Sequence, residues 1–322
     1  MICDIAIPIW NKKELTEQCV NSILANTDFP YRIILVDNAS SEPAKSYLES
    51  VAGQYPDKVK LIANKENLGN TGAGVQGMKY SDADYVCILD NDTIVCKGWL
   101  EEMVRIAEMS PNIGIVNPNS NSFGLNRKPG ESLEDFASSL MRENSGKYVE
   151  IGAAVGFCYL VKRKVMNEAG YWDEGFSPGY YEDTEYAMRI KKYGYKSVIA
   201  SGAYVYHDEH SSFKSKEKKR QFEGIFGRSR ERYYASYGRH KRILYVISRS
   251  LSDVKAFNEK IYAEADKCNF VDVIVKRRYG GIDLIRHGNV RKIVYGDAFF
   301  RLKVWLKVLT KKKRYDAVFY NI

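Results

Sequence analysis

Apolar and polar positions along the first ninety residues alternate between short hydrophobic runs and longer amphipathic stretches. Short runs rich in Ile, Val and Leu predict strands, and apolar residues repeated every three or four positions predict helices. The predicted strands cover residues 4–10, 31–40, 59–64 and 84–92. The predicted helices cover residues 12–27 and 41–56, and residues 70–81 are expected to be a glycine-rich turn that runs into a helix. This alternation predicts an α/β fold whose sheet is mainly parallel, with helices on both faces.

The pattern continues beyond these elements in three parts. "IGAAVGFCYLV" predicts a strand that leads into a helix, and a second helix is expected from about Glu182. We therefore expect a catalytic domain over residues 1–215, a basic helical linker over 216–241 and a small C-terminal α/β module over 242–322. Because its last predicted strand reaches residue 322, this module is expected to be either a small appendage or the truncated start of a second Rossmann-like domain.

Charge is distributed unequally between the two parts of the chain. Residues 1–213 carry 21 Lys+Arg and 29 Asp+Glu, whereas residues 214–322 carry 28 and 11. An acidic body suits a metal site, and a basic tail suits anionic membrane headgroups or phosphate-bearing acceptors, although a simple solvated face explains the tail equally well. No recognised nucleic-acid module accompanies the charge, so we expect no nucleic-acid partner.

Cysteine usage and hydropathy indicate the compartment. The six cysteines form no CxxC pair and several lie in apolar runs, which favours buried free thiols over disulfides or a zinc site. The N-terminal "MICDIAIPIW" lacks a basic region of the kind that opens a signal peptide, and "IGAAVGFCYLV" is too short to span a bilayer. We expect a cytoplasmic protein, with peripheral contact at the inner face of the membrane as a possibility.

Polar residues gather where the predicted strands end, which is where parallel sheets bind ligands. Asp37 and Asn38 could read the edge of a nucleobase, but Asp37 or Ser40 could equally cap the following helix. The glycines in "NLGNTGAG" would let the backbone approach a phosphate or a sugar, which is a weak signal taken alone.

The end of the strand "YVCILDND" carries the strongest chemical signal. Asp90 and Asp92 share one face of an extended chain and can both reach a hard divalent cation, although Asp92 could instead cap a helix. His207 follows another predicted strand and could complete the ligand set, or be structural. Burying two unpaired carboxylates would cost several kcal/mol, so a compensating partner is expected.

A second acidic pair lies at the predicted helix after the aromatic loop "FSPGYY". Glu182 and Asp183 stand at the positive end of the helix dipole, where capping could explain one of them. Together with Trp172 and Asp173 upstream, they suggest a site where rings hold a sugar and a carboxylate accepts a hydroxyl proton.

Taken in order, the motifs "IPIWN", "VDNASS", "NLGNTGAG", "LDNDT", "AGYWDEGF", "YYEDTEYAMRIKKYGY" and "VYH" resemble the inverting family 2 glycosyltransferases of the GT-A fold. The resemblance covers roughly residues 2–215 and is closest to bacterial enzymes that build surface polysaccharides or glycoprotein glycans. It implies a GT-A nucleotide-diphospho-sugar transferase fold and a hexosyl- or deoxyhexosyltransferase activity.

The resemblance also implies roles for individual residues. The metal ligands for Mn²⁺ or Mg²⁺ would be Asp90, Asp92 and His207, and Asp183 would be the general base, with Glu182 beside it. The donor-binding residues would be Pro8, Trp10, Asp37, Asn38, Asn67, Gly69, Asn70 and Asn91. The acceptor-binding residues would be Trp172, Asp173, Tyr180 and Tyr181.

Two details qualify this expected site. Trp10 stands where the family usually has Tyr, and Asn91 does not identify the nucleotide, so UDP- and dTDP-sugars both remain open. The segment after His207 corresponds to one that in relatives closes over the bound donor. The expected partners are a nucleotide-sugar donor and a glycan, lipid-linked or glycoprotein acceptor. The alternatives are a non-catalytic nucleotide-sugar-binding module and a nucleotidyltransferase.

Overall fold

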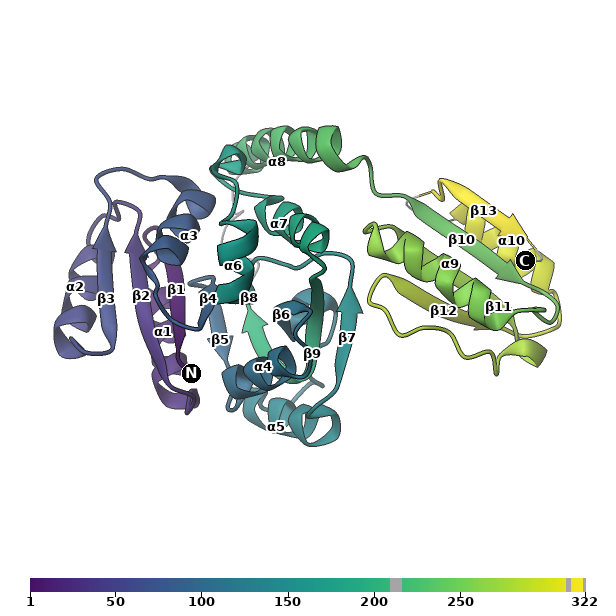
Figure 1. Cartoon of the computed structure of the whole chain (residues 1–322), viewed down its shortest axis with the longest axis horizontal. Coiled ribbons are helices and arrows are strands. Elements are labelled where there is room, and N and C mark those ends of the chain that lie inside the picture. Colours follow the sequence, from purple (N-terminus) through teal and green to yellow (C-terminus); the bar gives the residue numbers. More distant parts are fainter. Residues whose placement is uncertain (209–215, 311–313, 321–322) are drawn as a thin grey trace. The chain divides into compact units, whose positions relative to one another are not determined.

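The computed structural model describes residues 1–208, 216–310 and 314–320 of the chain. It divides into two compact units (Figure 1). The first unit comprises Met1–Tyr148 and Ala153–Tyr237, and the second comprises Val149–Gly152 and Gly238–Ile322. The segment after His207 that was expected to close over a donor begins in residues 209–215, which lie outside the described residues.

The first unit is built on one large mixed sheet. Its strands are β1 (Cys3–Ile9), β2 (Tyr31–Asp37), β3 (Val59–Ala63), β4 (Tyr85–Leu89), β5 (Thr93–Val95), β6 (Ile113–Asn119), β8 (Cys158–Lys162) and β9 (Lys196–His207). They follow the order β3-β2-β1-β4-β8-β6-β9-β5, and β3, β2, β1 and β4 are all parallel to one another. Antiparallel pairs join β8 to β4 and β6, and β5 to β9, so the sheet is mixed beyond β4.

Strand side chains alternate between two hydrophobic layers, as the period of two predicts. Ile5 and Ile7 of β1 face one layer and Ala6 faces the other. The first layer is covered by α1 (Lys13–Asn26), α2 (Ala44–Gln54) and α4 (Trp99–Glu108). The second is covered by α3 (Gly69–Tyr80), α6 (Arg163–Ala169) and α7 (Glu182–Ile190). The prediction of helices on both faces of the sheet is therefore confirmed.

The first unit also contains two further helices and three 3₁₀ turns among its described residues. They are α5 (Leu133–Asn144), α8 (Lys216–Tyr237) and the 3₁₀ turns η1 (Asn121–Phe123), η2 (Glu174–Phe176) and η3 (Lys191–Tyr193). The strand β7 (Tyr148–Ile151) starts at the boundary between the units. Aromatic residues of α8 pack on the loop before α7, where Tyr181 lies 5.1 Å from Tyr233 between ring centroids.

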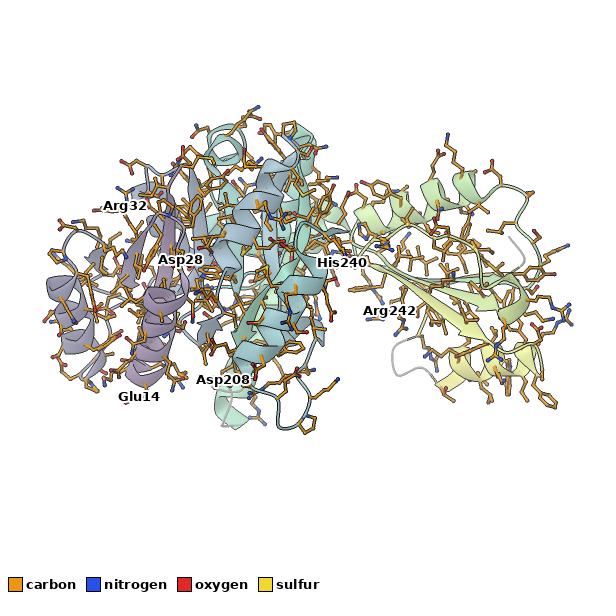
Figure 2. All side chains as sticks on the ribbon, turned by 90° about the horizontal axis from the view of Figure 1, so that it is seen from below. Glu14, Asp28, Arg32, Asp208, His240 and Arg242 are labelled. Atoms are coloured by element: carbon orange, nitrogen blue, oxygen red, sulfur yellow. The ribbon has the colours of Figure 1, made fainter. Side chains whose placement is uncertain are left out.

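The second unit is a smaller parallel sheet in the order β12-β11-β10-β13. Its elements are β10 (Arg242–Ile247), α9 (Val254–Asp266), β11 (Phe270–Lys276), η5 (Arg277–Tyr279), β12 (Val290–Tyr295), α10 (Phe300–Thr310) and β13 (Ala317–Tyr320). Phe257 and Ile261 of α9 pack on one face of the sheet, and Phe300 and Val304 of α10 pack on the other. Figure 2 shows the side chains of both units as sticks and labels Arg242, which starts β10.

Two local predictions need correction. The strand expected from Ile151 onward starts only at Cys158, because four of the six residues before it are Gly or Ala, which are depleted in strands. Gly72 and Gly74 lie inside α3, so the glycine-rich turn is shorter than expected. The six cysteines all lie in the described part of the chain and are buried and free, as predicted. Among the described residues, no helix has the length and apolarity needed to cross a membrane.

Candidate active site

The loop after β4 brings the first two acidic side chains into place. The backbone N–H of Asp90 donates to the Phe157 carbonyl over 2.8 Å, because β4 and β8 pair up to the residue before it. The Thr93 hydroxyl donates back to the Asp90 carbonyl over 2.8 Å and closes the turn. Asp90 and Asp92 therefore stand at the carboxyl end of a central strand, as the sequence predicted.

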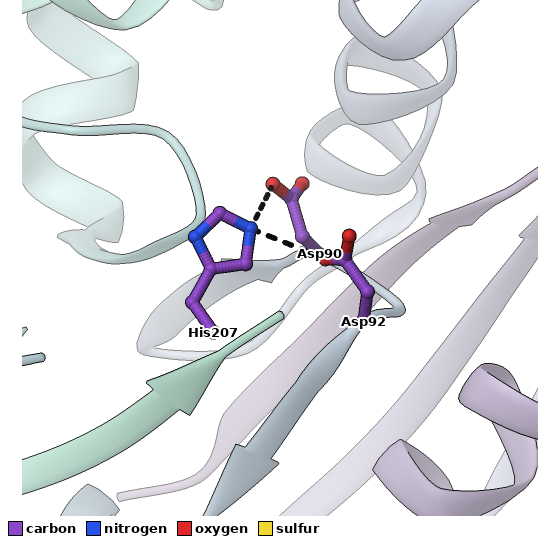
Figure 3. A group of neighbouring side chains, drawn as sticks. All are labelled: Asp90, Asp92 and His207. Carbon is purple, nitrogen blue, oxygen red and sulfur yellow. Dashed lines mark ion pairs between the residues drawn. The ribbon is translucent and has the colours of Figure 1, made fainter. Parts of the chain in front are cut away.

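His207 reaches these carboxylates through strand pairing. It is the last residue of β9 and lies opposite Thr93 in the antiparallel pair with β5. The backbone N–H of Asp208, labelled in Figure 2, donates to the Asp92 carbonyl over 2.9 Å. As a result His207 Nε2 lies 3.2 Å from Asp92 Oδ1 and 3.8 Å from Asp90 Oδ2 (Figure 3).

The imidazole of His207 is held from its other side. Its Nδ1 lies 3.0 Å from Ser122 Oγ, and its ring stacks on Phe157 with centroids 5.1 Å apart and an angle of 13° between planes. The Asn121 side chain makes hydrogen bonds with both the N–H and the carbonyl of His207, at 2.9 and 2.7 Å. These contacts aim Nε2 at the carboxylates, as expected for a metal-binding histidine.

The three side chains fit a divalent cation. One ligand atom from each of Asp90, Asp92 and His207 lies within 4.8 Å of the other two. Carboxylate oxygen with one imidazole nitrogen is a donor set that suits Mn²⁺ and also Mg²⁺. Burial, and next the neighbouring Asp92, raises the pKa of Asp90 to about 7. A bound cation would offset the repulsion between the Asp90 and Asp92 carboxylates that contributes to this raised pKa.

The second acidic pair begins α7, as predicted. Asp183 Oδ2 accepts a 2.6 Å hydrogen bond from the Gly156 N–H, and Oδ1 accepts 2.5 and 3.1 Å bonds from the Thr184 N–H and hydroxyl. Burial raises the pKa of Asp183, while these bonds oppose the shift. Asp183 and Asp90 are close enough for each negative charge to affect the other, since Asp183 contributes to the raised pKa of Asp90.

Glu182 is the more deeply buried of the pair. Its side chain is 4% exposed, and its Oε2 has no hydrogen-bond partner among the described residues. Burial, and after it the charge of Asp183, raises the pKa of Glu182 well above its ordinary value. A carboxyl group in this setting favours its protonated form.

The expected nucleotide-reading residues lie at adjacent strand ends. Trp10 follows β1 and is 57% exposed, so its ring is accessible. Asp37 ends β2 and is buried. Its Oδ1 accepts a 2.9 Å hydrogen bond from the Ser40 N–H, a local contact of the kind expected if Asp37 caps the following turn. Asn38 is also buried and donates to the Gly69 carbonyl over 3.0 Å.

The predicted donor-binding residues at the start of α3 make contacts within the protein itself. Asn67 Oδ1 accepts from the Gly69 N–H over 2.8 Å, and the Asn70 N–H donates to the Pro178 carbonyl over 2.7 Å. Gly69 has φ of 77°, and a Cβ there would lie 2.4 Å from Pro178 Cα. These contacts tie α3 to the loop that precedes α7.

The remaining predicted residues divide between packed and accessible positions. Trp172 is 3% exposed and donates from Nε1 to the Tyr159 hydroxyl over 3.1 Å, so its ring belongs to the core and is not open to an acceptor. Asp173 accepts from the Gly175 N–H and pairs with Arg232 of α8 at 2.8 Å. The part-exposed Tyr180 packs on Phe222 and Phe226 of α8.

Three further predicted positions have defined contacts. Pro8 is buried within β1. Asn91 donates to the Thr16 hydroxyl over 2.9 Å and so fixes the loop onto α1. Tyr181 is half-buried, has φ of 70° and packs on Phe226, Tyr233 and Tyr234 of α8.

Several residues that shape this site were not predicted from the sequence. Ser122, Asn121, Phe157 and Gly156 position His207, Asp90 and Asp183 through the contacts described above. The polar run "NPNSNSF", which begins in the last residues of β6, is the one local signal that could have drawn attention to Asn121 and Ser122. Their roles depend on strand pairing, which no local pattern encodes.

Comparison with solved structures shows what fold this is. A mannosyltransferase from Pyrobaculum calidifontis in complex with GDP-Man and Mn²⁺ matches with a TM-score of 0.52 and 19% identity over 71% of this chain and 64% of that one. GalNAc-T7 with UDP, GalNAc and Mn²⁺ matches with a TM-score of 0.54 and 16% identity over 73% and 50%. The fold is that of a GT-A glycosyltransferase, as the sequence predicted.

The family follows from the sequence itself. The family model described as glycosyl transferase family 2 matches residues 4–170, more than half of the chain. The chain therefore belongs to glycosyl transferase family 2, which confirms the resemblance seen in its motifs. The poly-beta-1,6-N-acetyl-D-glucosamine synthase of Staphylococcus aureus is 23% identical over 58% of this chain and 45% of its own length. The chain spans less than half the length of the curated relatives it matches first.

Proposed function

We propose that this chain transfers a sugar, with inversion, from a UDP- or dTDP-sugar to a hydroxyl group of a glycan, lipid-linked or glycoprotein acceptor. The observation that carries the proposal is the convergence of Asp90, Asp92 and His207 at the carboxyl end of the sheet, with Asp183 within electrostatic reach. Such a cluster suits a donor whose diphosphate is bound through Mn²⁺ or Mg²⁺. The Mn²⁺ complexes of the two structural neighbours support this assignment.

Asp183 is the proposed general base. It takes the proton of the acceptor hydroxyl as that oxygen bonds to the anomeric carbon, while the bond from this carbon to the diphosphate oxygen breaks on the opposite face. Burial makes Asp183 more basic than an exposed aspartate, and hydrogen bonds from Gly156 and Thr184 fix its orientation. A single displacement of this kind inverts the anomeric centre.

The other residues of the site would bind the cation, the nucleotide-sugar donor and the acceptor. Asp90, Asp92 and His207 would hold the cation, which supplies charge stabilisation for the departing diphosphate. The exposed Trp10 ring at the end of β1 offers a stacking surface for the nucleobase, and Asp37 lies at the end of the adjacent strand. On the acceptor side we retain Tyr180 and Tyr181.

Trp172 and Asp173 are not retained as acceptor contacts. The Trp172 ring is enclosed in the core, and Asp173 is engaged by Arg232 and the Gly175 N–H. Both instead stabilise the loop that leads to α7, because they join it to the core and to α8.

The test combines binding with turnover. Melting temperatures are measured with UDP-, dTDP-, GDP- and CMP-sugars, each with Mn²⁺ or with EDTA, for the wild type, Asp92→Asn and Asp183→Asn. We expect a metal-dependent rise with UDP- or dTDP-sugars that Asp92→Asn abolishes and Asp183→Asn retains. Donor hydrolysis or transfer should fall by about 10²- to 10⁴-fold in Asp183→Asn.

The exposed Asp57 provides a matched control, since Asp57→Asn should change neither readout. A wild-type protein that binds donor without turnover would show a non-catalytic binding module instead. Release of pyrophosphate from a nucleoside triphosphate would show a nucleotidyltransferase. Equal activity of Asp183→Asn and wild type would refute the assignment of the base.

A further inference from the structure

Helix α10 in the second unit has two separate apolar faces. One consists of Phe300 and Val304, which are buried against Leu244, Val246 and Ile274 of the sheet, with Val308 packed beside them. Their spacing of four residues places them in one row along the helix. This face is an ordinary core contact.

The second apolar face consists of residues that remain exposed. Leu302, Trp305, Leu306 and Leu309 are 49%, 56%, 43% and 60% exposed, and Phe299 just before the helix is 77% exposed. At about 100° per residue, the four helical positions form one stripe centred about 150° from the buried row. The stripe therefore points away from the sheet that α10 covers.

Charged residues flank this stripe in a regular way. On the same helical wheel, Arg301 and Lys303 lie on its two sides, about 90° to 110° from its centre. Residues 298–310 contain no Asp or Glu that would offset these two cations. Long basic side chains beside an apolar ridge can extend their charges past it while their methylene chains contact apolar surface.

We propose that the outward face of α10 is a docking surface for an anionic lipid bilayer. Large apolar side chains with a Trp among them, bordered by Lys and Arg, are the features of a helix that lies in the headgroup region of such a membrane. The charge of the second unit is complementary, because residues 238–322 carry 20 Lys+Arg and 8 Asp+Glu. The proposal is independent of the proposed glycosyl transfer.

Other occupants fit this face less well. A second copy of the chain docked through the same stripe would bring the same cations together without acids on the helix to neutralise them. A further helix in the layer of α10 would pack beside it on the sheet, whereas the stripe points away from the sheet. An anionic bilayer matches both the apolar area and the charge.

The experiment measures sedimentation of the full chain with vesicles of phosphatidylcholine alone and with vesicles that also contain phosphatidylglycerol. We expect binding to the anionic vesicles that weakens as salt is raised. Arg301→Gln with Lys303→Gln should lower this binding by about thirtyfold. Trp305→Ser with Leu309→Ser should lower it by at least about tenfold.

These four positions are exposed, so the variants should keep the wild-type melting temperature. Tyr193→Ser, at an aromatic 49% exposed in the first unit, serves as the control for loss of apolar surface. Arg228→Gln with Arg230→Gln, at exposed positions on α8, serves as the control for loss of charge. Lipids with brominated chains should quench tryptophan fluorescence in the wild type and quench it less in Trp305→Phe.

Three results would overturn the proposal. One is the absence of binding to anionic vesicles at low salt. The second is binding that survives both α10 variants but is lost in the α8 control. The third is a dimer in solution that disappears in Trp305→Ser with Leu309→Ser while vesicle binding is absent, since the face would then be covered by a second copy.

Discussion

The hydroxyl of Ser122 should control metal affinity through His207. Its Oγ lies 3.0 Å from His207 Nδ1, while Nε2 faces Asp90 and Asp92. If Nε2 binds the cation, Nδ1 carries the proton and donates it to Ser122, so Ser122→Ala removes the contact that selects this tautomer.

The structure limits the size of the effect. The loss of one hydrogen bond to a part-buried imidazole costs about 1 kcal/mol. The loss of a residue that supports a metal ligand typically weakens metal binding by about 10- to 100-fold. Phe157 stacking and the Asn121 bonds still hold the ring and backbone of His207 in Ser122→Ala. We therefore expect the lower end, about tenfold weaker Mn²⁺ binding, or about 1.4 kcal/mol.

The assay is a Mn²⁺ titration in the presence of a nucleoside diphosphate, with free Mn²⁺ measured by electron paramagnetic resonance. It is repeated in a double-mutant cycle with His207→Ala, where Ser122→Ala should have no further effect. Ser122→Thr keeps a hydroxyl and is the conservative control. Unchanged affinity in Ser122→Ala, or a tenfold loss that persists in the His207→Ala background, would refute the reasoning.

Two further predictions concern stability. Gly74→Ala should destabilise the chain by about 1 to 3 kcal/mol in urea unfolding, because a Cβ there would lie 2.7 Å from the Trp172 ring. Glu182→Gln should be more stable than the wild type at pH 8, by about 1 kcal/mol, because it removes a buried carboxylate with an unpaired oxygen.

A control variant tests the first of these predictions, and the pH dependence of stability tests the second. Gly53→Ala, also helical but with open space around its Cβ, should be neutral or stabilising. The pKa of Glu182 is raised in the folded state, so its contribution to stability is complete below the unfolded pKa and is lost as pH rises through the folded pKa. The advantage of Glu182→Gln should therefore vanish below about pH 4. An advantage that is constant with pH, or equal costs for the two glycine variants, would contradict these explanations.

The sequence by itself determined the α/β class and the family, and it selected the side chains that are proposed to be chemically active. Asp90, Asp92, Glu182 and Asp183 could be selected because a carboxylate at the end of an apolar strand, or at the start of a helix, is conspicuous in local sequence. Hydrophobic periodicity is likewise local, since each strand shows its alternation and each helix its repeat within a few residues.

Only the tertiary structure decided which of these side chains meet and which are used in packing. His207 reaches Asp92 because β9 pairs with β5, a contact between segments far apart in the chain. Trp172 and Asp173 lie in the same aromatic segment as Tyr180. Trp172 nevertheless packs in the core beside Tyr159, and Asp173 pairs with Arg232 of α8. The outward stripe of α10 could be told from its buried row only once the sheet was placed beneath it. Pairing and burial depend on distant partners, and a local pattern carries no information about them.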